Sequence, residues 1–190
     1  MKIAISGGGP GGLYFALLAK KTWPSHDIHV YERNRAEDTF GFGVVFSDET
    51  LDAFLARDPE SYDAITDQFA YWDEIDFNLH GETVRSTGHG FCGCGRVELL
   101  QILQRRCAEV GVVIDYSTEI NNPADIDADL VVGADGINSV VRDAFADYFQ
   151  PSFKWRKNRF AWLGTTKPYD AFTFDFTEDD HGIWVLGAYQ

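Results

Sequence analysis

The chain has 190 residues, of which 45% are hydrophobic, and its 30 acidic and 16 basic side chains give a formal net charge of −14. This length and composition are typical of a globular protein with one domain or slightly more. The negative charge argues against nucleic acid or an anionic membrane surface as a partner, and without an apolar run of roughly 20 residues we expect no membrane span and a cytoplasmic location.

A glycine-rich turn lies between the first predicted strand and the first predicted helix. Residues 2–6 read as a short apolar strand, residues 13–21 as a helix and residues 28–32 as a second strand. Gly7, Gly9 and Gly12 form a G-x-G-x-x-G fingerprint in the turn. The first glycine of this motif allows the tight turn, the second lets the backbone approach a pyrophosphate, and the third lets the helix pack closely on the strand. Bare amides and the helix dipole then hold the phosphates.

The second predicted strand ends in an acid that fits the same site. Glu32 lies about 20 residues after Gly12, where an acidic side chain that bonds ribose hydroxyls is expected. The fingerprint alone is a weak signal. Its place after a strand, together with the acid that follows, predicts a dinucleotide site.

The middle of the chain alternates helices with strands, and its end is aromatic and β-rich. Residues 34–47 read as a loop, 48–58 as a short helix, and 69–90 as an antiparallel β excursion with a turn near His80-Gly81. A helix is predicted at 96–110, and strands at 112–116, 130–133, 171–177 and 183–189. We therefore expect an α/β fold, with a Rossmann-like FAD/NAD(P)-type domain over 1–150 and the start of a β-rich substrate domain over 151–190. The last strand lacks later partners, so the sequence reads as truncated.

An Asp-Gly pair, Asp135-Gly136, follows the predicted strand at 130–133. Such a pair can form a hairpin turn, but a hairpin needs a second strand directly afterwards. Residues 139–142, Ser-Val-Val-Arg, favour a capped helix instead. That arrangement places the Asp135 carboxylate at the carboxyl ends of parallel strands, where ligands of such sheets bind.

Cysteine and histidine give no sign of a metal site. Cys92, Cys94 and Cys107 are too few for a disulfide scaffold, and the single residue between the first two is a poor metal signature. The five histidines are scattered without ligand spacing. We predict no metal site.

The two glycine motifs together resemble a known family. G-x-G-x-x-G with Glu32-Arg33, and Gly-Ala-Asp-Gly-Ile-Asn-Ser-Val-Val-Arg at 133–142, resemble the single-component FAD-dependent aromatic hydroxylases, the p-hydroxybenzoate hydroxylase group. Arg96 matches the family arginine that reaches toward the flavin; without the resemblance it reads as a surface arginine at a helix start. The other residues implied to bind FAD are Gly7, Gly9, Gly12, Glu32 and Arg33 at its ADP half, and Asp135 and Gly136 at the pyrophosphate–ribityl region.

A narrower resemblance runs through nearly all of the chain. Segments 31–35, 38–48, 88–96 and 158–166 look like the hydroxylase domain of salicylyl-CoA 5-hydroxylases and 2-aminobenzoyl-CoA monooxygenase/reductases. Those relatives commonly carry Trp where Phe42 stands, and segment 41–47 would be a mobile loop near the flavin or an ordinary connector. The family's second FAD motif, a Gly-Asp pair, would lie beyond Gln190, which puts independent activity of these residues in doubt.

The resemblance implies an FAD-dependent monooxygenase whose cofactor carries the chemistry. NADH or NADPH would reduce FAD, O2 would add to it, and the resulting flavin hydroperoxide would hydroxylate the activated ring of an aromatic acyl-CoA thioester. No side chain is assigned as a catalytic acid or base. No basic site for the CoA tail is identified in this acidic sequence, and we expect such groups downstream. The alternatives are a hydroxylase of a free aromatic acid or an indole compound, an NAD-dependent dehydrogenase, and a non-catalytic FAD-binding fragment; the oligomeric state stays open.

Overall fold

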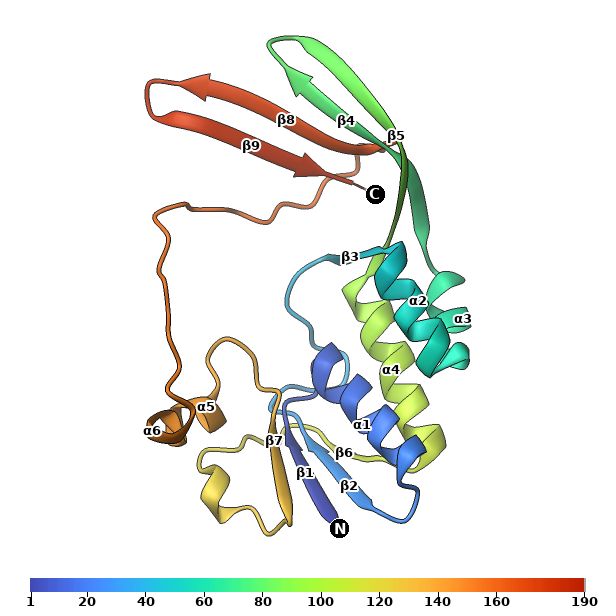
Figure 1. Cartoon of the computed structure of the whole chain (residues 1–190), viewed down its shortest axis with the longest axis vertical. Coiled ribbons are helices and arrows are strands. Elements are labelled where there is room, and N and C mark those ends of the chain that lie inside the picture. Colours follow the sequence, from blue (N-terminus) through green and yellow to red (C-terminus); the bar gives the residue numbers. More distant parts are fainter. Residues whose placement is uncertain (190) are drawn as a thin grey trace. The chain divides into compact units, whose positions relative to one another are not determined.

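The computed structural model describes residues 1–189, which form two compact units (Figure 1). The first unit comprises Met1–Gly41 and Arg96–Ala161. The second comprises Phe42–Gly95 and the described residues from Trp162 onward. The chain therefore leaves the first unit, returns to it and leaves it again.

The first unit is built on a parallel four-stranded sheet in the order β6-β2-β1-β7. Its central strand β1 pairs with both β2 and β7, in register from Ile3 with Ile28 and with Leu130. Ile5 and Val30 are fully buried, as expected for the inner strands of a parallel sheet covered by helices. The strands are β1 (Lys2–Ser6), β2 (Asp27–Tyr31), β6 (Val113–Asp115) and β7 (Leu130–Gly133).

Two helices, α1 (Pro10–Thr22) and α4 (Arg96–Val110), pack against each other beside this sheet (Figure 1). The Sγ of the buried Cys107 donates to the backbone oxygen of Leu13 at 3.2 Å between them. The start predicted for the first helix, Leu13, is wrong: the helix begins at Pro10, with Gly9 as N-cap. Proline suits the first helical position because its fixed φ is helical and its missing N–H would have no partner there.

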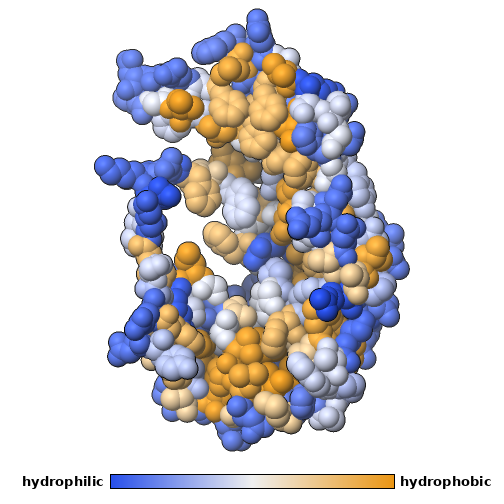
Figure 2. Space-filling model, in the orientation of Figure 1, coloured by the Kyte–Doolittle hydropathy of each residue, from blue (hydrophilic) through white to orange (hydrophobic). Residues whose placement is uncertain are grey.

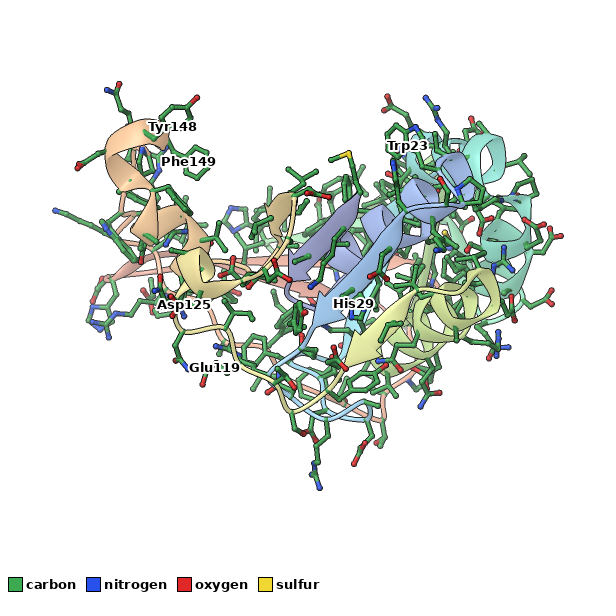
Figure 3. All side chains as sticks on the ribbon, turned by 90° about the horizontal axis from the view of Figure 1, so that it is seen from below. Trp23, His29, Glu119, Asp125, Tyr148 and Phe149 are labelled. Carbon is green, nitrogen blue, oxygen red and sulfur yellow. The ribbon has the colours of Figure 1, made fainter. Side chains whose placement is uncertain are left out.

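The remainder of the first unit consists of short helices and loops. These are the 3₁₀ helix η1 (Pro123–Asp125), α5 (Val140–Ala144) and α6 (Ala146–Phe149). Figure 3 shows Tyr148 and Phe149 on α6, His29 on β2 and Glu119 in the loop after β6. The helix predicted after the Asp-Gly pair is confirmed as α5. Ser139 is its N-cap, and the Ser139 side chain accepts a hydrogen bond from the Arg142 N–H.

The second unit is a mixed five-stranded sheet in the order β3-β5-β4-β8-β9. The antiparallel β4–β5 hairpin turns at His80-Gly81 as predicted, and β8 joins it by pairing parallel to β4, with Ile75 opposite Phe172. The strands are β3 (Gly43–Ser47), β4 (Ala70–Leu79), β5 (Glu82–Gly95), β8 (Phe172–Asp179) and β9 (Gly182–Ala188), and the helices are α2 (Asp48–Arg57) and α3 (Pro59–Thr66).

The loop predicted over residues 34–47 is wrong at its end. Residues 43–47 form β3, which is held by pairing with the far end of β5, from Gly43 opposite Gly95 to Ser47 opposite Phe91. Apolar side chains gather over the strands of the sheet (Figure 2). Aromatic rings pack along it, such as Phe172 against Phe174 with ring centres 4.8 Å apart. The predicted α/β class, with a Rossmann-like parallel sheet and an antiparallel excursion, is confirmed; β8 and β9 join the strands of that excursion in one mixed sheet.

Candidate nucleotide-binding site

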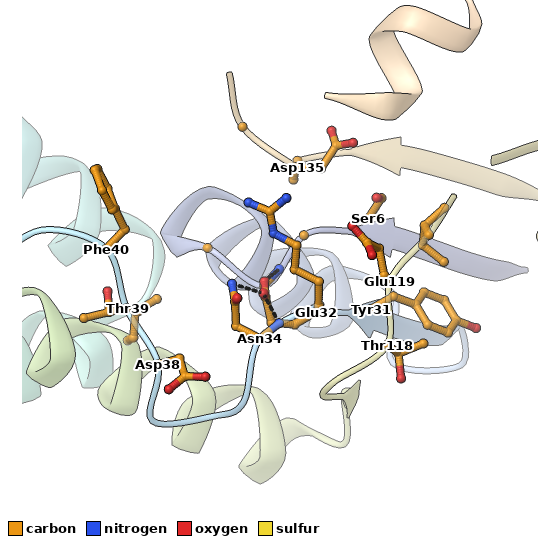
Figure 4. Close-up of a pocket in the computed structure, with 18 of the residues that line it drawn as sticks. Ser6, Tyr31, Glu32, Asn34, Asp38, Thr39, Phe40, Thr118, Glu119 and Asp135 are labelled. Carbon is orange, nitrogen blue, oxygen red and sulfur yellow. Dashed lines mark hydrogen bonds between the residues drawn. The ribbon is translucent and has the colours of Figure 1, made fainter. Parts of the chain in front are cut away.

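A pocket of about 700 Å³ lies within the first unit, at the carboxyl ends of β1, β2 and β7 (Figure 4). This edge of a parallel sheet is where the fold class places its ligands. Seven of the eight residues predicted from the sequence line it, namely Gly7, Gly9, Glu32, Arg33, Arg96, Asp135 and Gly136.

The glycine-rich turn gives each of its three motif glycines a different role. Gly7 has φ +107°, and a Cβ there would come within 2.4 Å of the Ala134 backbone oxygen, so the turn lies directly against the end of β7. Gly12 does not line the pocket, because it faces the turn: its Cβ would stand 2.0 Å from the Gly7 oxygen. A Cβ on Gly9 would meet no protein atom within 4 Å, because it would point into the pocket that Gly9 lines.

Glu32 connects the end of β2 with the glycine-rich turn. Its Oε2 accepts from the Gly8 N–H at 2.7 Å, while its Oε1 accepts from the backbone and side-chain nitrogens of Asn34 at 2.8 and 2.7 Å (Figure 4). A carboxylate offers about four acceptor sites, so Oε2 retains capacity for a further donor. Glu32 therefore shapes the pocket wall even without a ligand, a role that the sequence did not reveal.

Asp135 divides its two oxygens between the protein and the pocket. Oδ2 accepts from the Val140 and Val141 N–H groups at 2.7 and 3.3 Å, which satisfies the first turn of α5. Oδ1 is buried and has no hydrogen-bond partner among the described residues. The adjacent Gly136 has φ +80° and open space where a Cβ would stand. A buried oxygen without a partner, next to a backbone position with free space around it, can accept a hydrogen bond from a ligand.

Two further buried polar atoms without partners in the described chain belong to pocket residues. They are Nε of Arg96, at the start of α4, and Oγ1 of Thr39. Burying a polar group without a partner is costly, and such groups are rare in folded proteins. Their concentration around this pocket indicates a polar ligand.

The sequence missed the two loops that complete the pocket. Residues 34–40 follow β2 and residues 118–120 follow β6. The Thr118 N–H donates to the Glu32 backbone oxygen at 2.9 Å, and Gln104 Nε2 donates to the Ala36 oxygen at 3.0 Å, which holds the first loop against α4. Their only sequence signal was their place after parallel strands.

These features fit a dinucleotide such as FAD. The first turn of α1 leaves backbone N–H groups without intrahelical partners, and the open position at Gly9 admits a phosphate to them. Of the arginines that line the pocket, Arg35 is paired with Asp38, and its guanidinium lowers the pKa of that carboxyl. Arg33 and Arg96 make no ion pair with described residues and remain available to a ligand.

Comparison with curated proteins gives three informative relatives. The chain is 45% identical over all 190 residues to a salicyloyl-CoA 5-hydroxylase from a Streptomyces species. It is 32% identical over 189 residues to the 3-hydroxy-4-methyl-anthranilyl-(aryl-carrier protein) 5-monooxygenase of Streptosporangium sibiricum, and 30% identical over 200 positions to the protodeoxyviolaceinate monooxygenase of Chromobacterium violaceum. The chain is a homologue of aromatic-compound monooxygenases. It spans 37%, 53% and 52% of these relatives, and no protein-family profile matches it.

Solved structures show the same fold. A 2-methyl-3-hydroxypyridine-5-carboxylic acid oxygenase superposes with a TM-score of 0.67 at 24% identity, covering 76% of this chain and 42% of its own. A monooxygenase from Photorhabdus luminescens subsp. laumondii, described as FAD-containing, gives a TM-score of 0.61 at 24% identity over 79% of this chain and 42% of its own. The predicted resemblance to FAD-dependent aromatic hydroxylases is confirmed.

No helix within residues 1–189 combines the length and the apolar character that crossing a bilayer requires. Over the same range, no group of His, Cys, Asp or Glu side chains has the arrangement of a metal site. Cys92 and Cys94 are both buried in β5, and burial raises the pKa of the Cys92 thiol to about 11.

Proposed function

We propose that this chain is the FAD-binding part of a monooxygenase that hydroxylates the ring of an aromatic acyl-CoA thioester. The observation that carries the proposal is the 45% identity to a salicyloyl-CoA 5-hydroxylase, which extends over every residue of the chain. The pocket supports it, because its phosphate-accepting turn, its acid after β2 and its unpartnered buried atoms suit a dinucleotide.

The assignment of residues follows from their positions. The amides at the start of α1, exposed through Gly9, would hold the pyrophosphate, and Glu32 would accept from a ribose hydroxyl with its remaining capacity on Oε2. Arg33 would contribute positive charge at the ADP half. Oδ1 of Asp135 and Nε of Arg96 would bond polar groups nearer to the flavin, with the Gly136 backbone beside them.

FAD, when bound, supplies the electron transfer and oxygen activation that side chains cannot perform. The overall reaction consumes the aromatic thioester, O2, NADH or NADPH and one proton. One oxygen atom enters the ring as a hydroxyl and the other leaves as water. This chain's own residues bind and orient the cofactor, and we assign none of them as a catalytic acid or base.

The test is cofactor consumption by the full-length, FAD-loaded protein. NADH and NADPH oxidation would be followed with salicyloyl-CoA and 2-aminobenzoyl-CoA, and with the two free acids as matched controls. We expect stimulation by a thioester and a hydroxylated product in equal amount. Stimulation by a free acid alone would leave the fold and the flavin in place and would refute the thioester assignment.

A further inference from the structure

Positive charge in this acidic chain is concentrated in one exposed connection. Between Asp147 and Asp170 the sequence contains no acidic residue at all, although the chain has 30, and it carries five of the 16 basic residues. Four of them fall within the basic segment, defined here as residues 154–160 and reading Lys-Trp-Arg-Lys-Asn-Arg-Phe. Such a local reversal of sign creates a positive potential that attracts anions.

The charges of the basic segment are unpaired in the described structure. Elsewhere basic side chains commonly meet carboxylates, as Arg85 does with Asp76 at 2.6 Å and Lys2 with Asp127 at 2.9 Å. The basic residues of the segment are Lys154, Arg156, Lys157 and Arg159. None of them forms an ion pair with any of residues 1–189. All of them are exposed, and the segment belongs to no helix or strand, as the coil between α6 and β8 in Figure 1 shows. Neighbouring like charges repel one another, so this arrangement favours a bound anion.

Two exposed aromatic rings stand among these charges. Trp155 and Phe160 are each 90% exposed. Exposed aromatic rings alternating with Lys and Arg are the combination by which proteins hold nucleotides, since a base stacks on the ring while cations contact the phosphates.

The start of the basic segment is tied to the pocket wall. The guanidinium of Arg142 lies over the ring of Phe153 at 4.9 Å, and its Nη1 donates to the backbone oxygen of Ile137 at 2.7 Å. Ile137 lines the pocket. Phe153 directly precedes Lys154, so the cations begin one residue after a ring that contacts Arg142, and Arg142 in turn is bonded to the pocket residue Ile137.

We propose that the basic segment binds the phosphorylated adenosine end of the CoA thioester, a role that rests on the proposed function. CoA carries a 5′-diphosphate, a 3′-phosphate and an adenine, which match the cations and the exposed rings. Its pantetheine arm separates these groups from the acyl ring. The segment can therefore hold the phosphates without lining the pocket. The proposed site lies within this chain, whereas the sequence led us to expect basic groups for CoA downstream.

The test measures binding rather than turnover. Affinity of the FAD-loaded, full-length protein for CoA and for 3′-dephospho-CoA would be measured by calorimetry, with Arg156→Gln/Arg159→Gln and Trp155→Ala as variants. The matched control is Arg57→Gln/Arg105→Gln, which removes two exposed arginines outside the segment. We expect the segment double variant to weaken CoA binding at least about tenfold, because each arginine loses a charge-assisted bond to phosphate. We also expect added salt to weaken the wild type more than this variant.

The outcomes separate this inference from the proposed function. Unchanged CoA affinity in both segment variants overturns the inference, even if thioesters are hydroxylated. Equal losses in the segment variant and in the control overturn it too, because they show a general charge effect. Binding of a phosphopantetheinyl carrier protein without affinity for CoA would replace the nucleotide by a protein partner and also overturns it. FAD content of each variant, expected to equal that of the wild type, verifies folding.

Discussion

The carboxylate of Glu32 accepts a hydrogen bond of 2.7 Å from the backbone N–H of Gly8, which ties the end of β2 to the turn between β1 and α1. A side chain expected to recognise a ribose thus first organises the loop that would receive the phosphates. We therefore expect binding and local stability to be coupled at this residue, and the coupling can be measured.

Replacing Glu32 by Ala should weaken both FAD retention and the cofactor-free fold. The Gly8 N–H and the Asn34 amide lose their acceptor, which costs about 1–3 kcal/mol for a part-buried group. Urea unfolding of the flavin-free protein and flavin fluorescence on dilution measure the two effects. Glu119→Ala is the control, since Glu119 is another acid lining the pocket but is exposed and in a loop. A Glu32→Ala protein as stable as the control would contradict the structural role.

Alanine substitutions at three glycines at the start of α1, namely the N-cap Gly9 and the helical Gly11 and Gly12, should separate folding from binding. Gly12→Ala places a Cβ against the Gly7 oxygen, so we expect loss of soluble protein or destabilisation of several kcal/mol, on the order of the largest single-residue effects. Gly9→Ala meets no protein atom and should preserve the fold while lowering FAD affinity. Gly11→Ala, which also has open space but does not line the pocket, should retain FAD. Full flavin loading of Gly9→Ala would exclude close approach of a phosphate there.

Asp135 and Ser139 both cap α5, but only Asp135 lines the pocket. Either substitution by Ala should lower the free energy of unfolding by about 0.5–2 kcal/mol, as loss of a helix cap does. Only Asp135→Ala should lower FAD retention in addition, because it removes the unpartnered Oδ1. Thermal unfolding and the flavin-to-protein absorbance ratio test this pair. Equal flavin loss in both variants would mean that α5, rather than the carboxylate, is what the cofactor needs.

The Asp76–Arg85 pair should make the stability of the second sheet depend on acid pH. Both carboxylate oxygens of Asp76 accept from Arg85, at 2.6 and 2.7 Å, and these bonds lower the pKa of Asp76. A carboxyl whose pKa is lower in the folded protein stabilises the fold at pH values above its unfolded-state pKa of about 3.9. This stabilisation is lost as the pH falls through the folded-state pKa. Asp76→Asn should thus unfold at a lower temperature than wild type at pH 7. The two melting curves should converge below about pH 4; a constant difference down to pH 2 would refute the assignment.

The sequence predicted elements whose pattern is local. The helix at 96–110 matches because its apolar residues recur at helical spacing and Gly111, with φ +85°, ends it. The strand at 130–133 is present as the apolar run predicts, but it is the edge strand β7, in which Leu130 and Gly133 are exposed and Val131 and Val132 are only half-buried. Five of the seven pocket residues could be predicted because the glycine, acid and Asp-Gly signals each stand at the end of a strand, whereas Arg33 and Arg96 followed only from the family resemblance.

What the sequence did not reveal depends on distant partners. Residues 43–47 follow a Gly-Phe-Gly sequence at 41–43 that is typical of a loop, and they form a strand because β5 runs beside them. The parallel pairing of β4 with β8 joins residues about a hundred positions apart, for which no local pattern exists. Likewise the carboxylate of Glu32 looked free for ribose, since its bond to Gly8 spans two elements.

The interleaving of the two units along the chain constrains how the protein is made. During synthesis the β4–β5 hairpin emerges before β6 and β7, so part of the second unit is available while the first still lacks two strands of its sheet. The edge of β4 that pairs with β8 then stays open to other chains until β8, which ends at Asp179, has been synthesised. Expression temperature and chaperone supply should therefore decide the yield of this protein more than the stability of its finished fold, and circular permutants that make either unit continuous should relieve the delay.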